Sequence, residues 1–217
     1  MSLKWLGIAG AVIVAVLALT WQASGNIPTK FMGEASTFKT ATPHVALKSG
    51  LGSGSGVHIG NGYIVSAAHV VGTATQMVLT DSEKRSTPAT VLRVNKEYDI
   101  ALLHVESMHF HYTATAPLNC APNYVGQKVI AYGNPMGIEF LYTRGEVNGA
   151  SRKHMIWKEV VPLDGTIVYG QSGGGVIDSV DGSVVGITVG LVPTPYGIAA
   201  IGFAVPARVV CHLLGRA

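Results

Sequence analysis

The sequence Gly170-Gln171-Ser172-Gly173-Gly174-Gly175 lies immediately before the apolar stretch Val176-Ile177. A serine flanked by glycines can lie on a tight turn, because glycine adopts backbone conformations that other residues avoid. Neighbouring backbone N–H groups can then converge on one point, as acyl-transfer chemistry requires. Glycine- and serine-rich turns are also common in ordinary loops, so this run alone does not separate a nucleophile from a surface turn.

A histidine follows a predicted β-strand further upstream. The run from Gly62 to Val71 reads Gly-Tyr-Ile-Val-Ser-Ala-Ala-His-Val-Val, so a strand ends in small residues just before His69. Histidine is the usual base for activating a serine, because its ordinary pKa of about 6.5 leaves it mostly neutral near pH 7. Without a visible partner, a buried and hydrogen-bonded core histidine is the alternative interpretation.

A carboxylate opens the strongly apolar stretch Tyr98-Asp99-Ile100-Ala101-Leu102-Leu103. Burying a charge is costly unless a specific group receives it, and an imidazole N–H is such a group. Of the five aspartates in the chain, three lie in polar, turn-like surroundings and Asp164 belongs to the segment leading into Ser172. Asp99 is therefore the carboxylate that we expect to pair with His69.

The order His69, Asp99, Ser172 is that of chymotrypsin-type proteases and differs from the order in subtilisins and α/β-hydrolases. At these residues the chain resembles the trypsin-like serine proteases, and most closely their HtrA/Deg (high-temperature-requirement) branch. The resemblance covers nearly everything from about residue 42 to the C-terminus. The residues that carry it are Gly54 to Val57, the strand into His69, Asp99 to Leu102, Val125-Gly126, Ala131 to Pro135, Asp164 to Gly174 and Gly202 to Pro206.

Two residues depart from the family pattern. Gln171 precedes the candidate nucleophile, where this branch usually has asparagine and the digestive enzymes have aspartate. Because glutamine has no charge to pair with a newly cleaved N-terminus, we do not expect activation by that route. Gly175 stands in place of the usual proline or alanine, which predicts a looser turn without the loss of a catalytic group.

The later chain favours an all-β fold, because it is rich in Val, Ile, Gly and Thr with short apolar runs. The resemblance implies two six-stranded antiparallel β-barrels, at about residues 42–106 and 122–205, with the active site between them. Apolar residues at helical spacing after Pro206 predict a short C-terminal helix. The predicted strands are 45–48, 57–59, 63–65, 77–79, 90–93, 100–105, 128–131, 146–150, 159–162, 175–178, 184–189 and 199–205.

The resemblance implies a serine endopeptidase that hydrolyses peptide bonds through a His-Asp-Ser triad and an acyl-enzyme, with no cofactor and no metal. His69 is then the general base, Asp99 holds its tautomer, and Ser172 is the nucleophile. The backbone N–H groups of Gly170 and Ser172 form the oxyanion hole. Two other functions stay open: a catalytically silent, membrane-tethered binding or chaperone-like module, and hydrolysis of small esters.

The resemblance also points to a substrate pocket without charge. Thr166, six residues before the candidate nucleophile, is at the pocket floor and cannot neutralise a substrate Lys or Arg. We therefore predict cleavage after small or medium aliphatic residues, with the substrate backbone added as a β-strand. The residues that border this pocket are Thr188, Val189, Gly190 and Leu191.

Residues Trp5 to Trp21 are almost wholly apolar, and Lys4 precedes them. A helix of this length reaches about 25 Å, enough for a tilted membrane span. Tryptophans at both ends suit an uncleaved anchor, while a cleaved signal peptide is the alternative. We assign 1–21 to the anchor or signal, 22–41 to a tether and 42–217 to the protease domain, outside the cytoplasm in the periplasm or extracellular space, or secreted after cleavage.

Other partners have less support from the sequence. The net charge is only +3 without a Lys/Arg cluster, so we do not expect nucleic-acid binding. His109 and His111 share a strand face, but a metal-free pair is favoured because no further ligands cluster nearby. No PDZ-like domain is expected before the sequence stops at Ala217, and a homotrimer is expected only by analogy with relatives. Whether Cys120 and Cys211 form a disulfide stays open.

Overall fold

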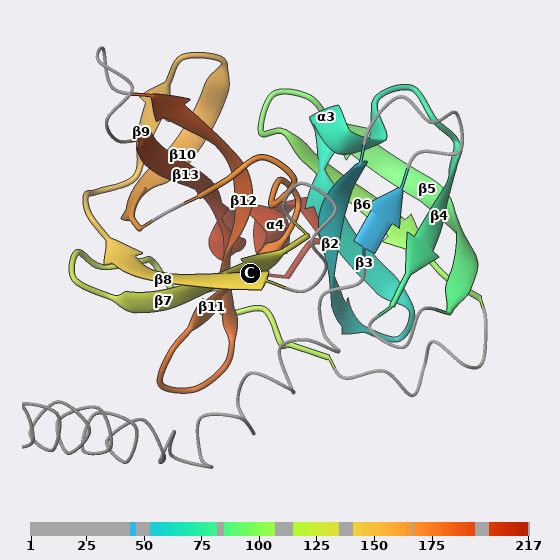
Figure 1. Cartoon of the computed structure of the whole chain (residues 1–217), viewed down its shortest axis with the longest axis horizontal. Coiled ribbons are helices and arrows are strands. Elements are labelled where there is room, and N and C mark those ends of the chain that lie inside the picture. Colours follow the sequence, from blue (N-terminus) through green and yellow to red (C-terminus); the bar gives the residue numbers. More distant parts are fainter. Residues whose placement is uncertain are drawn as a thin grey trace, which may run out of the picture. The chain divides into compact units, whose positions relative to one another are not determined.

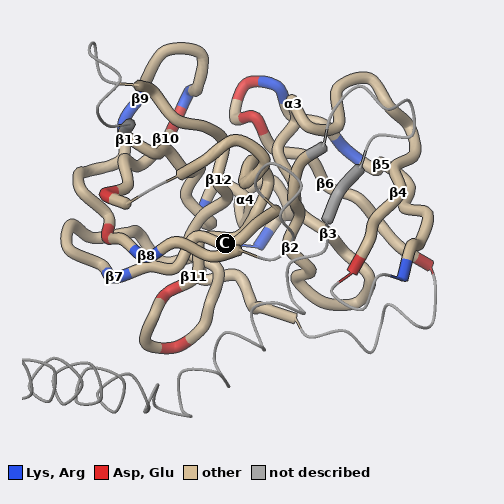
Figure 2. The backbone as a smooth tube through the Cα atoms, in the orientation of Figure 1, with Lys and Arg blue, Asp and Glu red and all other residues tan. Residues whose placement is uncertain are grey.

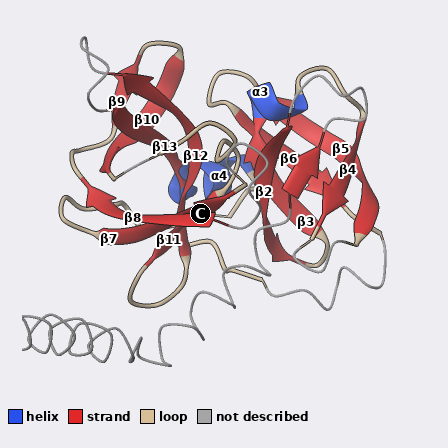
Figure 3. Ribbon diagram, in the orientation of Figure 1, coloured by secondary structure: helices blue, strands red, loops and turns tan. Residues whose placement is uncertain are grey.

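In the computed structural model of the chain, the described residues form two groups of antiparallel strands with two short helices (Figures 1 and 3). Strands dominate because Val, Ile and Thr alternate with small or polar residues through most of these segments. The all-β prediction with a short C-terminal helix is confirmed. The structure describes residues 44–46, 53–81, 85–106, 115–134, 141–165, 167–193 and 200–216.

The first group is a closed barrel, as predicted. Its strands follow the order β1-β2-β3-β6-β5-β4, and every neighbouring pair is antiparallel. Fully buried Val57, Ile64 and Leu103 fill its interior. Because the barrel is closed, all six strands find partners and no edge stays unpaired. The strands are β1 (His44–Ala46), β2 (Ser53–Gly60), β3 (Tyr63–Ala67), β4 (Gln76–Thr80), β5 (Ser86–Asn95) and β6 (Ile100–His104).

The second group is a sheet of seven described strands in the order β13-β12-β11-β7-β8-β10-β9. An additional pairing between β13 and β10 closes six of these strands into a ring, to which β9 is added. The prediction of six strands lacked β9, because its Arg-Lys-His sequence has no apolar alternation. The strands are β7 (Lys128–Gly133), β8 (Leu141–Val147), β9 (Arg152–His154), β10 (Trp157–Asp164), β11 (Gly175–Asp178), β12 (Val184–Pro193) and β13 (Ala200–Pro206).

Of the two described helices, one follows a strand of the first barrel and the other follows the last strand of the second. Helix α3 (Ala68–Val71) is a single turn that follows β3 directly. Helix α4 (Ala207–Leu213) begins after Pro206 and buries Val209 and Val210, as the apolar spacing predicted. One cluster of buried apolar side chains continues from the first barrel into the second, so the barrels share part of their core.

A disulfide joins Cys120, in the connection between the barrels, to Cys211 on α4, with 5.9 Å between the two Cα atoms. The sequence had left this pairing open. The bond closes a long loop, since the two cysteines are 91 residues apart. Such a cross-link commonly stabilises a protein by about 2–4 kcal/mol, mainly by restricting the unfolded chain.

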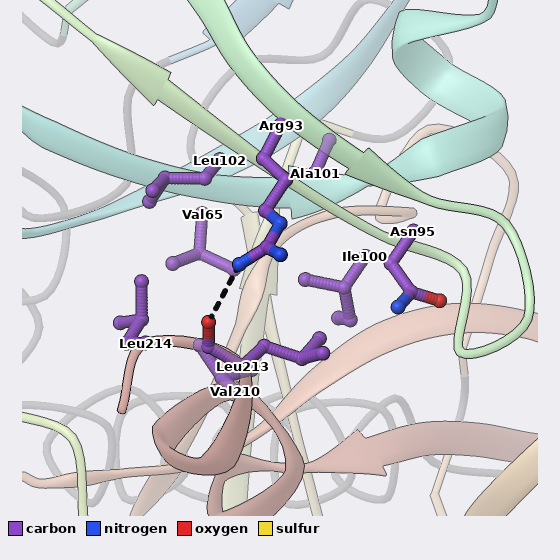
Figure 4. Close-up of a pocket in the computed structure, with 9 residues that line it drawn as sticks. All are labelled: Val65, Arg93, Asn95, Ile100, Ala101, Leu102, Val210, Leu213 and Leu214. Atoms are coloured by element: carbon purple, nitrogen blue, oxygen red, sulfur yellow. Dashed lines mark hydrogen bonds between the residues drawn. The ribbon is translucent and has the colours of Figure 1, made fainter. Parts of the chain in front are cut away.

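Helix α4 also contacts the first barrel (Figure 4). The guanidinium Nη1 of Arg93 on β5 donates a hydrogen bond of 3.2 Å to the carbonyl of Leu213. Beside this bond, Val65 and Leu102 of the barrel and Val210 of the helix line a small apolar cavity of about 230 Å³. The C-terminal helix therefore connects the second barrel to the first by polar and apolar contacts as well as by the disulfide.

Several expectations fall on other parts of the chain. The apolar run 5–21, the tether 22–41, Thr166, and the pair His109 and His111 lie outside the described residues. Within the described segments, neither helix has the length and apolar character that a bilayer span needs. Charged residues are scattered over both barrels in these segments (Figure 2), and the domain boundaries stay predictions.

Candidate active site

The pairing of β3 with β6 brings His69 and Asp99 together. Ala67, the last residue of β3, lies opposite Ile100, the first residue of β6. His69 follows that end of β3 and Asp99 precedes that end of β6. The backbone N–H of Ala68 donates to the carbonyl of Asp99 at 3.1 Å, which extends the ladder by one bond.

The Asp99 carboxylate accepts two hydrogen bonds from His69. Oδ1 accepts the backbone N–H at 2.9 Å, and Oδ2 lies 2.8 Å from Nδ1 of the imidazole. Asp99 is only 7% exposed, whereas the His69 side chain is 47% exposed. Because an ionised carboxylate only accepts, Nδ1 carries the proton and Nε2 of a neutral ring keeps a free lone pair. This arrangement can present a base toward the solvent side.

Asp99 adopts an unusual backbone conformation at this point. Its φ of 57° is in the left-handed region, which costs a non-glycine residue about 1–2 kcal/mol. The turn before it is held by Asn95, whose Oδ1 accepts the backbone N–H of Tyr98 at 3.1 Å. The surrounding structure therefore maintains a strained turn that directs the carboxylate at His69.

Backbone bonds from both barrels hold the turn that carries Ser172. In the second barrel, Gly173 donates to the carbonyl of Thr188 at 2.7 Å, and Thr188 donates to Gly174 at 2.9 Å. From the first barrel, the N–H of Ser55 donates to the carbonyl of Ser172 at 2.8 Å. The serine turn therefore lies at the contact between the barrels.

The turn lies close to the strand end that precedes His69. A Cβ built on Gly173 would overlap the carbonyl of Ser55 and the hydroxyl of Ser66, and would lie 3.0 Å from the backbone nitrogen of Ala67. No hydrogen bond within the described residues joins the Ser172 hydroxyl to His69. In proteins without bound substrate such catalytic bonds are often long or poorly aligned.

The segment before Ser172 has a defined backbone conformation. Gly170 has a φ of 98°, which an L side chain rarely adopts, and its carbonyl accepts the hydroxyl of Ser55 at 2.8 Å. Oε1 of Gln171 accepts the backbone N–H of Val168 at 2.9 Å. Neither Gly170 nor Ser172 uses its backbone N–H in a hydrogen bond to another described residue. Among the described residues, these two N–H groups are therefore without an acceptor.

A buried polar network with residues from both barrels supports this segment. Ser55 and Asn134 are fully buried, and the Ser55 hydroxyl accepts the backbone N–H of Asn134 at 2.9 Å. The Ser66 hydroxyl donates to the Ser55 carbonyl at 2.7 Å. Sequence reasoning quoted the segments that contain Ser55 and Asn134 but assigned these two side chains no role. Their positions beside glycines, Gly54 and Gly56 for Ser55 and Gly133 for Asn134, were the available signal.

Sequence reasoning also missed Trp157, the first residue of β10. Its indole Nε1 donates to Oδ2 of Asp99 at 3.1 Å. The next residue, Lys158, forms an ion pair of 2.8 Å with Glu97, and the hydrogen bond to Glu97, followed by one to Tyr98, raises the pKa of Lys158. A single tryptophan between Ile156 and Lys158 carries no pattern that would connect it to a distant aspartate.

A cavity of about 480 Å³ lies beside His69, and it involves only one of the four predicted pocket-border residues. Val189 lines this cavity, whereas Thr188 is fully buried. Gly190 and Leu191 are half-buried on β12. The remaining lining residues are Ala68, Gly72, Thr73, Lys96, Asp99, Ile156 and Trp157.

Within the described segments, no group of three or more His, Cys, Asp or Glu side chains is arranged to hold a metal ion.

Two antiparallel barrels that contribute separate groups to one site define a double-barrel β protein. The family model for the trypsin-like peptidase domain matches residues 54–187, and the chain belongs to this family. The match extends from β2, which contains Ser55, into β12. It therefore includes His69, Asp99 and Ser172.

Individual relatives agree with this family. The chain is 30% identical over 159 residues to the probable periplasmic serine endoprotease DegP-like of Chlamydia pneumoniae, covering 72% of this chain and 32% of that protein. It is 30% identical over 169 residues to the periplasmic serine endoprotease DegP of Escherichia coli (strain K12), covering 76% and 35%. The chain thus spans about a third of the length of these relatives.

A solved structure supports the fold. The crystal structure of the serine endoprotease from Yersinia pestis superposes with a TM-score of 0.74 at 23% sequence identity. The superposition covers 88% of this chain and 67% of that one. At this level of identity the likeness concerns the fold alone.

The close approach at Gly173 can be tested against a second glycine. Gly173 and Gly126 both have a φ of +84°, but a Cβ on Gly126 would meet nothing within 4 Å. We expect Gly126→Ala to lose about 1–2 kcal/mol of unfolding free energy from backbone strain, and Gly173→Ala to lose about 1–3 kcal/mol more from overlap with Ser55 and Ser66. Urea unfolding of both variants measures the difference, and equal losses would contradict the close contact.

Proposed function

We propose that the chain is a serine endopeptidase that hydrolyses peptide bonds through Ser172, His69 and Asp99. The observation that carries this proposal is the hydrogen bond between Nδ1 of His69 and the buried carboxylate of Asp99, on the side of the barrel that the serine turn contacts. A carboxylate in that position selects the imidazole tautomer that can accept a proton at Nε2. The endoprotease names of the relatives support the same activity.

In the proposed mechanism, Nε2 of His69 takes the proton of the Ser172 hydroxyl as the oxygen attacks the substrate carbonyl. Asp99 stabilises the imidazolium that forms and keeps the ring oriented. His69 then returns the proton to the leaving amine, which releases the first product and leaves an acyl-enzyme. A water molecule, activated by the same imidazole, hydrolyses the ester and regenerates Ser172.

The oxyanion of the tetrahedral intermediate needs donors that are oriented beforehand. We assign this role to the backbone N–H groups of Gly170 and Ser172. The hydroxyl of Ser55 and the amide of Gln171 restrict the turn on which these groups lie. Donors fixed in this way do not reorganise when charge develops, which is the main source of their effect on rate.

Replacement of the proposed nucleophile tests the activity directly. We expect Ser172→Ala to lower kcat by about 10⁶-fold and to abolish labelling by a fluorophosphonate probe. Asp99→Asn should lower kcat about 10⁴-fold, because the amide favours the wrong imidazole tautomer. Ser179→Ala, at an exposed turn after β11, is the matched control and should leave turnover unchanged.

The same assays separate the alternative functions. A catalytically silent binding or chaperone-like module would not react with the probe, and an esterase would react but would not digest casein. Normal turnover in purified Ser172→Ala would refute the proposed mechanism. Digestion of casein that is lost with this substitution supports the endopeptidase.

We further propose that the substrate binds along β12 as an added strand and that cleavage follows small or medium aliphatic residues. Up to Ile187, β12 pairs with β11 on one side and β13 on the other. From Gly190 to Pro193 the described pairings of β12 are with β13 alone, so the opposite edge can receive a peptide backbone. Val189, Gly190 and Leu191 offer no charge on this edge.

A peptide library tests this specificity. We expect cleavage after valine or alanine to exceed cleavage after arginine, because an uncharged pocket cannot compensate a desolvated guanidinium. Product sequencing by mass spectrometry gives the residue before each cut, with Ser172→Ala as the background. Selective cleavage after arginine or lysine would contradict the uncharged pocket.

We also propose that residues 5–21 anchor the chain in a membrane, with the protease domain on the periplasmic or extracellular side. The relatives' names place those proteins in the periplasm. The Cys120–Cys211 disulfide supports the same side, because disulfides persist mainly in oxidising compartments.

Fractionation of expressing cells tests the anchor. The full chain should stay with membranes after an alkaline carbonate wash, because about seventeen apolar residues partition into the bilayer. A variant without residues 1–41 should be released. The cysteines of the full chain should resist alkylation until a reductant is added. Recovery of the full chain in the carbonate wash would contradict this location, and so would alkylation of its cysteines without a reductant.

A further inference from the structure

One oxygen of the Asp99 carboxylate has partners from both barrels. Oδ2 accepts Nδ1 of His69 at 2.8 Å and Nε1 of Trp157 at 3.1 Å. Trp157 comes from β10 of the second barrel, whereas His69 and Asp99 belong to the first. Both Trp157 and Asp99 are 7% exposed, so their hydrogen bond is shielded from water. In such surroundings a hydrogen bond to a charged group is stronger than at the surface.

Packing fixes the direction of the Trp157 ring. The ring lies against Phe203, with 5.8 Å between the centroids and 29° between the planes. Phe203 in turn stacks on His154 of β9, at 4.6 Å. On another side, a Cβ on Gly190 would come within 3.0 Å of the indole, so only glycine leaves room for the ring as it stands. The indole N–H is therefore aimed at Asp99 by neighbours on three strands.

The strand that carries Trp157 also contacts the turn that carries Asp99. The backbone N–H of Lys158 donates to the carbonyl of Glu97 at 3.2 Å. The ion pair between these two side chains is exposed and contributes little by itself. The backbone bond nevertheless sets the distance between the start of β10 and the Asp99 turn.

We propose that Trp157 is a positioning residue that completes the hydrogen bonding of the Asp99 carboxylate from the opposite barrel. The carboxylate then has three donors: the backbone N–H of His69, Nδ1 of His69 and the indole of Trp157. Loss of the indole N–H leaves part of a buried negative charge without a donor. The catalytic consequence of this role rests on the proposed function, but the effect on His69 does not.

The charged groups around His69 define what a titration measures. Asp99 and Lys96 line the same cavity as the imidazole, and Glu97 and Lys158 form their ion pair on the adjacent turn. Trp157→Phe changes none of these charges. It retains an aromatic ring and removes one donor from the carboxylate. The indole N–H stabilises the Asp99 carboxylate more when His69 is neutral than when His69 is a protonated imidazolium that already compensates the charge. Loss of the indole N–H therefore favours the protonated form of His69.

Two measurements test the role of Trp157. In the active protein, we expect Trp157→Phe to lower kcat about ten-fold with little change in KM, and to move the acid limb of the pH profile of kcat/KM to higher pH. In a Ser172→Ala background, NMR titration of labelled His69 should show a midpoint at higher pH when Trp157→Phe is added. The second measurement needs no turnover, so it tests this proposal even if the proposed function fails.

Gly126→Ala is the matched control, because its backbone strain destabilises the fold while the Trp157 ring, its packing neighbours and the indole N–H are unchanged. We expect it to lower the midpoint of thermal unfolding and to leave the His69 titration where it was. Thermal unfolding of Trp157→Phe verifies that the variant is folded at the NMR temperature. Coincident His69 titrations in Trp157→Phe and its parent, or an equal displacement in Gly126→Ala, would overturn the assignment and leave Trp157 with a packing role only.

Discussion

The buried carboxylate of Asp99 is the constraint on which the arrangement of the site depends. A charge that is removed from water must be compensated by donors, and here the donors are the backbone N–H and the imidazole of His69 and the indole of Trp157. They reach the carboxylate only if β3 and β6 keep their register and the start of β10 stays beside the turn. One buried charge thus links the strand register of the first barrel to the position of the second barrel beside it.

Ser55 of the first barrel holds the turn that carries Ser172. Its backbone N–H binds the carbonyl of Ser172 and its hydroxyl binds the carbonyl of Gly170, so one residue of the first barrel holds both ends of a turn from the second. Gly133 and Gly173 allow this approach, because a side chain at either position would collide with it. The position of the serine relative to the base therefore depends on small residues and backbone bonds more than on the identity of neighbouring side chains.

The sequence was sufficient to predict the fold class, the closed first barrel and the helix after Pro206, because these follow from a β-favouring composition with short apolar runs, from helical spacing near the C-terminus and from a family resemblance. It could not predict β9, whose Arg152–His154 sequence is polar and forms a strand only because β10 offers a partner. Likewise, Trp157 and Ser55 act through contacts between residues more than fifty positions apart. Such contacts leave no local periodicity, and the pairing of Cys120 with Cys211 was undetermined for the same reason.

The division of the candidate site between two barrels has a consequence for biosynthesis. A nascent chain that has emerged as far as β6 can form the His69–Asp99 pair, since both residues and their register lie within the first barrel. It then carries a base without an alcohol to activate. Ser172 follows 68 residues after the end of β6, and its turn is held by bonds to both barrels. The complete candidate site can therefore form only after the second barrel has been synthesised and has packed against the first.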